Sequence, residues 1–247
     1  MGNNFEQYKM TFDYHTHTTF SHGKGSIEDN VKAALAQGLH AIAITDHGPG
    51  HLTYGVKRKN FAVMREEIER LKPLYPDIDI YLSVEANVIS VGNYLDVKES
   101  EKPWFDFLIG GYHYGILHGY CMGNWLDAHH LAPAAVGKSL LVKNTDMTIK
   151  ALYENDLKFL THPGDKGRFD IKEIAKACAA TDTWMEISTW HEHLTTEEIR
   201  VAATEDVKFI VSSDAHSPNR VGSFEGGIKR AIEAGIDIDR IVNIEVK

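Results

Sequence analysis

The sequence has few cysteines, no long apolar run and no excess of positive charge. Its 247 residues include two cysteines, Cys121 and Cys178, which lie far apart and outside any C-x-x-C pattern. This argues against a disulfide framework and against a thiolate zinc site, and it suits a reducing compartment. No apolar stretch approaches the roughly 18 residues that a membrane-spanning helix needs. The formal charge of −9 argues against nucleic acid as a partner of the isolated chain.

Segments that mark other classes of protein are also missing. The opening MGNNFEQYKM has no apolar core of a secretion signal, and Glu6 stands where a myristoylation signal requires serine or threonine. There is no linker rich in glycine, serine or proline, no low-complexity segment and no repeat of fixed period. We therefore expect a globular, cytoplasmic protein in which residues 1–247 form a single domain.

What the sequence does contain is an alternation of short apolar runs and amphipathic helical patterns. Helical spacing covers 26–38, 59–74 and 195–205, and strand-like runs occupy 12–14, 41–45, 80–84, 105–109, 158–160, 183–187, 208–211 and 241–244. Repeated βα units predict an α/β fold with a largely parallel sheet, and their number favours a closed or distorted barrel. The weakly patterned stretch at about 114–142 interrupts this alternation, and we interpret it as an insertion over one face.

Histidine and carboxylate side chains follow six of the predicted strands. They are His15 and His17, Asp46 and His47, Glu85, His113, His162, and Asp214 and His216, with His22 shortly after the first pair. In a parallel barrel the carboxyl ends of the strands converge on one rim, where active sites lie. The pattern therefore predicts one cluster of ligand-type side chains.

These residue types indicate a centre with more than one metal ion. Imidazole and carboxylate together suit Zn²⁺, Mn²⁺ or Fe²⁺. Seven histidines and two carboxylates exceed the ligands that a single ion can use, so we expect two or three divalent ions. A carboxylate such as Glu85 would bridge two of them. A hydroxide held between the ions would serve as the nucleophile, and the ions would neutralise charge on phosphoryl oxygens.

The ordered motifs HTHT…H, TDHGP, VEAN, GYH, THPG and SDAH resemble those of the PHP (polymerase and histidinol phosphatase) family. The chain is most similar to its stand-alone bacterial phosphatases with a trinuclear metal centre, and the resemblance covers nearly the whole chain. It implies a distorted seven-stranded (β/α) TIM-like barrel and metal-dependent hydrolysis of phosphoesters. Two departures concern the substrate: the long 114–142 stretch, and EISTWHEH where relatives often carry asparagine or a basic residue.

The resemblance also implies which side chains hold each ion. His15, His17, Glu85 and Asp214 would hold the first ion, and Glu85 would bridge to a second ion bound by His113 and His162. The third ion would be bound by His22, His47 and His216.

Four further residues are candidates for the reaction itself. Asp46, with Glu85, is a candidate catalytic residue. It could orient His47, act as an acid or cap a turn, and we favour the orientation of His47. Arg168 and Arg220 follow ligand-bearing strand ends and could bind phosphate through the planar guanidinium. His191 either contacts the substrate at the rim or lies on the solvated surface.

The favoured function is a phosphatase that acts on a small phosphomonoester, with chemistry like that of a histidinol phosphatase. Because PHP modules also occur as proofreading exonucleases, a nuclease or phosphodiesterase is the alternative, although no polymerase domain is present. An amidohydrolase on a similar barrel would carry a metal-bridging lysine after a strand, and none is found. A non-catalytic metal-binding protein would predict eroded ligands, and none is missing.

Overall fold

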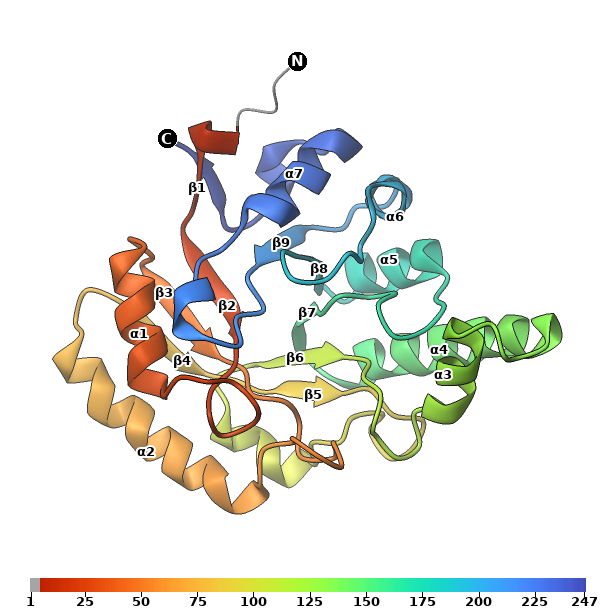
Figure 1. Ribbon diagram of the computed structural model, residues 1–247, viewed down its shortest axis with the longest axis horizontal. Helices are drawn as coiled ribbons and strands as arrows, with labels where there is room; N and C mark the ends of the chain where they lie inside the picture. Colours follow the sequence, from red (N-terminus) through yellow and green to blue (C-terminus); the bar gives the residue numbers. More distant parts are fainter. Residues whose placement is uncertain (1–4) are drawn as a thin grey trace.

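The computed structural model describes residues 5–247, and its centre consists of parallel strands surrounded by helices (Figure 1). One sheet has the order β2-β3-β4 and the other the order β5-β6-β7-β8-β9, and all neighbouring pairs are parallel. The strands are β2 (Phe12–Thr16), β3 (Ala41–Ile44), β4 (Asp79–Leu82), β5 (Glu85–Asn87), β6 (Leu108–Gly111), β7 (Leu157–Leu160), β8 (Trp184–Ser188) and β9 (Phe209–Ser212). The predicted α/β fold with parallel strands is confirmed.

The two sheets are joined at both of their edges. Only Ser83 and Val84 separate β4, which pairs with β3, from β5, which pairs with β6. A parallel bridge connects His47 with Glu85, and a second connects Thr16 with Ala215 after β9. The carboxyl ends of strands from both sheets therefore meet in one region.

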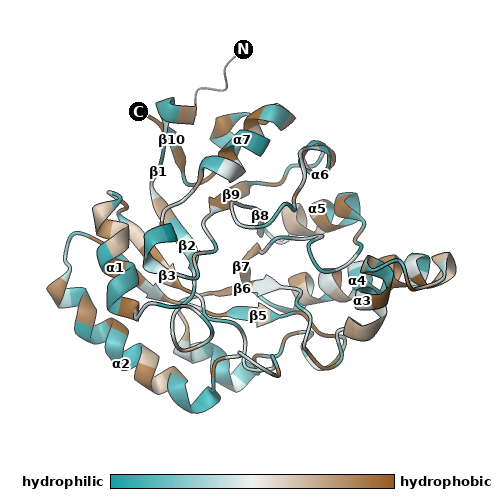
Figure 2. Ribbon diagram, in the orientation of Figure 1, coloured by the Kyte–Doolittle hydropathy of each residue, from teal (hydrophilic) through white to brown (hydrophobic). Residues whose placement is uncertain are grey.

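The helices cover the outside of these sheets (Figure 1). They are α1 (Ile27–Ala36), α2 (Phe61–Leu71), α3 (Cys121–Ala128), α4 (Ala134–Glu154), α5 (Ile171–Ala180), α6 (Thr196–Ala202) and α7 (Glu225–Ala234). Hydrophilic and hydrophobic residues alternate along α2 (Figure 2), and Phe61, Met64, Ile68 and Leu71 are its buried residues. None of the helices within 5–247 combines the length and the apolar character that crossing a membrane requires.

Local sequence signals explain where two of the predicted helices begin. Ser26 accepts a hydrogen bond from the backbone N–H of Asp29, whose carboxylate accepts one from the N–H of Ser26. Thr195 and Glu198 form the same reciprocal cap at the start of α6. Such caps satisfy N–H groups that have no partner inside the helix, and the predicted starts at these two residues are confirmed.

Two parts of the chain differ from the predicted pattern. The weakly patterned 114–142 stretch contains α3 and the first turns of α4. Their periodicity is weak because the buried residues of α3 are the polar Asn124 and Asp127, and those of α4 inside the stretch are only Gly137 and Leu140. The apolar run at 241–244 makes one isolated parallel bridge to the sheet, between Ile241 and Phe209 of β9, and adds no further parallel strand. Instead, β10 (Ile244–Val246) pairs antiparallel with β1 (Tyr8–Met10), which lies at the other end of the described chain.

Candidate metal centre

The carboxylate of Glu85, the first residue of β5, lies at the centre of a group of imidazoles. Its Oε1 is 2.9 Å from His162 Nε2, 3.3 Å from His113 Nε2 and 3.4 Å from His15 Nε2. Its Oε2 is 2.9 Å from His47 Nδ1, and the carboxylate is completely buried. Thr161 Oγ1 donates a 2.7 Å hydrogen bond to Oε1, which fixes the rotation of the carboxylate. One side chain thus faces ligand-type groups from four other segments of the chain.

Asp214 is a second carboxylate that faces this group. Its Oδ1 lies 3.1 Å from His17 Nε2 and 3.5 Å from His15 Nε2. The backbone of Asp214 has a positive φ of 48°, and that of His162 a φ of 26°. Side chains other than glycine rarely adopt this conformation, and such residues concentrate at functional sites.

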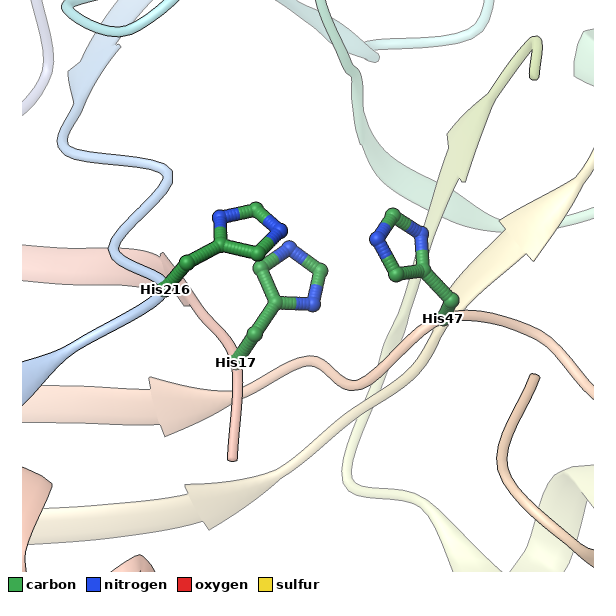
Figure 3. A group of neighbouring side chains, drawn as sticks. All are labelled: His17, His47 and His216. Atoms are coloured by element: carbon green, nitrogen blue, oxygen red, sulfur yellow. The ribbon is translucent and has the colours of Figure 1, made fainter. Parts of the chain in front are cut away.

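The structure brings the nine predicted ligands to one place. Three of them, His17, His47 and His216, come from segments after β2, β3 and β9, and their rings point into a common space (Figure 3). Four sets of three residues have ligand atoms within 4.8 Å of one another: His17, His47 and His216; His15, His162 and Asp214; His15, His17 and Glu85; and His47, Glu85 and His113. These overlapping sets fit metal binding.

His22 lies beside these sets and takes part in none of them. Its ring centre is 4.3 Å from that of His216 and 4.8 Å from that of His47, while Tyr54 packs on it at 4.2 Å. The set that contains His47 and His216 includes His17 in place of His22. The grouping of His22, His47 and His216 around one ion therefore stays a prediction.

Many of the converging atoms are buried and have no hydrogen-bond partner. Binding of a metal ion would supply a partner for them. They include His15 Nε2, both ring nitrogens of His17 and of His47, Glu85 Oε2, His113 Nε2, His162 Nδ1 and Asp214 Oδ1. Leaving a buried polar group unpaired costs about 1–3 kcal/mol. The concentration of such atoms in one region is the expected signature of residues arranged to hold ions.

The electrostatics of the cluster keep several of these groups in the form that binds a cation. Burial and the neighbouring His216 lower the pKa of His17 to about 3, and the same two causes lower the pKa of His22 to about 4. Burial opposes ionisation of Glu85, but the imidazoles of His113 and His15 hold its pKa well below the usual value. Neutral imidazole and ionised carboxylate are the protonation states that ligate metals.

His15 differs because a buried carboxylate that the sequence patterns did not single out lies behind it. Glu186 Oε1 lies 2.5 Å from His15 Nδ1, and its Oε2 accepts a 2.6 Å hydrogen bond from the backbone N–H of His162. Ser212 donates a further hydrogen bond to the same carboxylate. Burial lowers the pKa of His15, but Glu186 and Asp214 outweigh it and raise that pKa well above the usual value. The pairing with Glu186 directs His15 Nε2 toward the cluster.

Asp46 does not perform the predicted task of orienting His47. Its carboxylate accepts hydrogen bonds from the backbone N–H and hydroxyl groups of Thr18 and Ser21, at 2.5–3.2 Å. Both nitrogens of the His47 ring lack a hydrogen-bond partner. Because Thr18 and Ser21 belong to the loop that carries His22, Asp46 holds that loop in place.

His191 lies at the edge of the cluster. Its Nε2 is 3.1 Å from Asp214 Oδ2, and its Nδ1 is 3.2 Å from Asp165 Oδ1. Burial lowers the pKa of His191, but the hydrogen bonds to these two carboxylates outweigh it and raise the pKa to about 9. The solvated-surface alternative is wrong, since the side chain of His191 is only 19% exposed.

The two candidate arginines occupy different surroundings. Arg220 borders a cavity of ≈300 Å³ that His22, Lys24, Trp190, His216 and Ser217 also line. Its guanidinium lies over the Trp190 ring at 4.3 Å, and its buried Nε has no hydrogen-bond partner. Arg168 borders a separate cavity of ≈430 Å³. Its Nε donates a 2.6 Å hydrogen bond to Asp127, so this guanidinium already has an anionic partner.

The chain resembles known proteins over almost its full length. The PHP domain family matches residues 13–194. A probable phosphatase of Thermoanaerobacter sp. (strain X514) is 29% identical, with 96% of this chain and 92% of the relative covered. A probable phosphatase of Acetivibrio thermocellus is 23% identical, with 97% and 93% covered. Among solved structures, the histidinol phosphate phosphatase of Lactococcus lactis, crystallised with zinc, L-histidinol and phosphate, has the same fold. Its TM-score is 0.63 at 17% identity, and the match covers 92% of this chain and 95% of that one.

Proposed function

The chain belongs to the PHP family and is a metal-dependent phosphatase, and we propose that its substrate is a small phosphomonoester. The observation that carries this proposal is the convergence of buried imidazole and carboxylate atoms around Glu85 without hydrogen-bond partners. The histidinol phosphatase of similar fold, which holds zinc, L-histidinol and phosphate, supports a small phosphorylated substrate.

We further propose that the cluster holds two or three ions of Zn²⁺, Mn²⁺ or Fe²⁺. One ion would be held by His15, His17, Glu85 and Asp214, and a second by Glu85, His113 and His162. The carboxylate oxygens of Glu85 and Asp214 lie 2.9–3.7 Å from the imidazole nitrogens of these histidines, which supports the two sites. A third would be held by His47 and His216 with His22. Such ions supply Lewis-acid chemistry, which activates water and neutralises charge on phosphoryl oxygens.

The protein's own residues would orient the substrate. Arg220 lies at a cavity that two of the proposed ligands, His22 and His216, also border, so its guanidinium can reach a phosphate held at the ions. His191, whose ring lies between Asp165 and Asp214, would contact the substrate at the rim. Asp46 contributes indirectly, because it fixes the loop that carries His22.

We also propose that the two parallel sheets form one closed architecture around the site. The bridges of His47 to Glu85 and of Thr16 to Ala215 support a single distorted seven-stranded barrel in which β4 and β5 are two parts of one strand. The free thiols of Cys121 and Cys178 are compatible with a cytoplasmic location.

A panel of substrates tests the proposed function. Protein reconstituted with Mn²⁺ or Zn²⁺ should release phosphate from small phosphomonoesters such as p-nitrophenyl phosphate and histidinol phosphate. It should act weakly on bis(p-nitrophenyl) phosphate and on single-stranded DNA. Faster cleavage of the diesters would favour the nuclease or phosphodiesterase alternative, and cleavage of amides alone would overturn both.

Replacing Arg220 with alanine should raise KM for a phosphomonoester and weaken inhibition by inorganic phosphate, each about 10-fold. A hydrogen bond to a charged group contributes about 1.5–3 kcal/mol, and 1.4 kcal/mol corresponds to tenfold in affinity. Arg220→Lys should recover only part of the loss, because an ammonium lacks the planar fork. Arg168→Ala is the matched comparison and should change phosphate inhibition less, since Asp127 already pairs with this guanidinium.

Ion content is measured in all three variants and should equal that of the unmodified protein. Unaltered phosphate inhibition in both alanine variants would remove both arginines from the site and leave the ions and His191 to hold the phosphate.

A further inference from the structure

A buried carboxylate outside the predicted ligand set lies behind the metal centre. Asp96 is 9% exposed, and both of its carboxylate oxygens accept hydrogen bonds. The donors are the backbone N–H of Asn87 at 2.8 Å, the Asn87 side-chain amide at 2.6 Å and the backbone N–H of Gly50 at 2.7 Å. Within residues 5–247, no lysine or arginine side chain forms an ion pair with this carboxylate. The Asp96 carboxylate is therefore held by uncharged N–H donors, while Arg58 Nη2 donates a 2.7 Å hydrogen bond to the Asp96 backbone carbonyl.

These contacts fix the orientation of the Asn87 side chain. Because Asn87 Nδ2 donates to Asp96 and also lies 3.3 Å from the carbonyl oxygen of Gly48, the amide oxygen must point the other way. That oxygen, Oδ1, lies 2.8 Å from His113 Nδ1. An amide oxygen only accepts hydrogen bonds, so His113 Nδ1 is the protonated nitrogen and donates to it.

The consequence for His113 is a defined tautomer. With the proton on Nδ1, the lone pair of Nε2 is free, and this atom is buried without a hydrogen-bond partner 3.3 Å from Glu85 Oε1. A ligating histidine usually donates its other ring N–H to an oxygen in this way, which sets the direction of the ring.

The same carboxylate also holds the loop that follows β3. A Cβ atom at Gly48 would lie 2.5 Å from both carboxylate oxygens of Asp96, and one at Gly50 would lie 2.8 Å from Oδ2. Only glycine allows this close approach. Since Gly48 directly follows His47, whose Nδ1 is 2.9 Å from Glu85 Oε2, Asp96 links two side chains on opposite oxygens of Glu85.

We propose that Asp96 is a positioning residue for the metal centre: through Asn87 it sets the tautomer of His113, and through Gly50 it holds the loop that carries His47. This proposal rests on the proposed function in one respect: it takes His113 as a metal ligand. The experiment that tests it measures the binding of an ion and not the hydrolysis of a substrate.

The variant Asp96→Asn tests this chain of contacts. Asp96 accepts hydrogen bonds through both carboxylate oxygens, but an asparagine at this position has only one acceptor oxygen. Its NH₂ group would then face the N–H donors that Oδ2 accepts from now, and the Asn87 side chain would lose its partner. We expect the affinity for one ion per chain to fall about 10–100-fold, as loss of such supporting groups typically causes. Competition between Zn²⁺ binding and a chromogenic chelator measures this, and mass spectrometry counts the ions that remain. Asp106→Asn is the control for replacing a carboxylate: Asp106 also accepts a backbone N–H, that of Leu82 at 2.8 Å, and it pairs with Arg65 at 3.1 Å, and neither partner is a proposed ligand.

A double-mutant cycle separates positioning from a general loss of stability. In a His113→Ala background, Asp96→Asn should lower Zn²⁺ affinity by much less than it does alone, because the tautomer that it sets no longer exists. If Asp96→Asn does not fold, Asn87→Ala carries the same test, since it removes the link to His113 and leaves two N–H donors on Asp96. Folded variants with unchanged Zn²⁺ affinity, or fully additive effects, would overturn the proposal. Normal ion binding without hydrolysis of any phosphomonoester would instead overturn the proposed function.

Discussion

Replacing Glu85 with glutamine should lower phosphatase turnover at least about 100-fold. The carboxylate lies within 2.9–3.7 Å of five imidazoles, so its negative charge and both of its oxygens serve more than one proposed ion site. A glutamine removes that charge and turns one acceptor into a donor that faces ring nitrogens. Metal ions contribute several kcal/mol of charge stabilisation, and each 1.36 kcal/mol is tenfold in rate.

His22→Ala is the comparison and should reduce turnover less. His22 is exposed and belongs to none of the four close ligand sets, so its loss disturbs at most one ion. Steady-state kinetics and ion content are measured on both variants, and thermal unfolding confirms that both are folded. Equal losses, or a fully active Glu85→Gln variant with all of its ions, would contradict the assigned roles.

Removing the ions with a chelator should abolish phosphatase activity and lower the midpoint of thermal unfolding by about 5–10 °C. A ligand present at 100 times its Kd stabilises the folded state by about 2.7 kcal/mol, and 1 kcal/mol corresponds to about 2–4 °C for a chain of this size. The effect is expected because, without ions, the buried nitrogens and oxygens of the cluster lack partners.

Activity and thermal midpoint should both return when Mn²⁺ or Zn²⁺ is added back after the chelator has been dialysed away. Mg²⁺ serves as the control, because it prefers oxygen ligands and should restore little. Full activity in protein shown to contain no ion would contradict metal dependence.

The ligand cluster could be predicted from the sequence because its members stand at recognisable places. Each except His22 lies near or just after the carboxyl end of an apolar run, and these runs form parallel strands whose carboxyl ends lie together. His15 and Glu85 therefore met in space although 70 positions separate them along the chain. Strand positions alone were sufficient for this, and no knowledge of side-chain rotamers was needed.

The supporting carboxylates could not be predicted in the same way. Glu186 lies inside an apolar run and Asp96 in an irregular segment, and their roles depend on contacts with His15 and Asn87 that only the folded chain shows. The available signal was weak: a glutamate within the strand-like run WMEIS is costly to bury unless it has partners. Asp46 shows the reverse error, since its neighbour in sequence, His47, is not its partner in space.

The helices of the 114–142 stretch were missed for a related reason. Helical periodicity becomes visible when the buried side is apolar, whereas the buried residues of α3 are Asn124 and Asp127. Asn124 accepts a 2.8 Å hydrogen bond from Asn144 of α4, just beyond the stretch. A pattern of hydrophobic residues cannot report a buried face that is held together by amide groups.

The number of metal ions per chain tests the central claim most directly. Inductively coupled plasma mass spectrometry measures the metal content, which is divided by an accurate protein concentration. Two samples are compared: protein purified without chelator, and protein reconstituted with Mn²⁺ or Zn²⁺. The nine converging ligand-type side chains predict two or three ions per chain. Zinc in a preparation counts toward this number without identifying the native metal, since the Irving–Williams order favours zinc over manganese and iron. One ion or none after reconstitution would contradict the account.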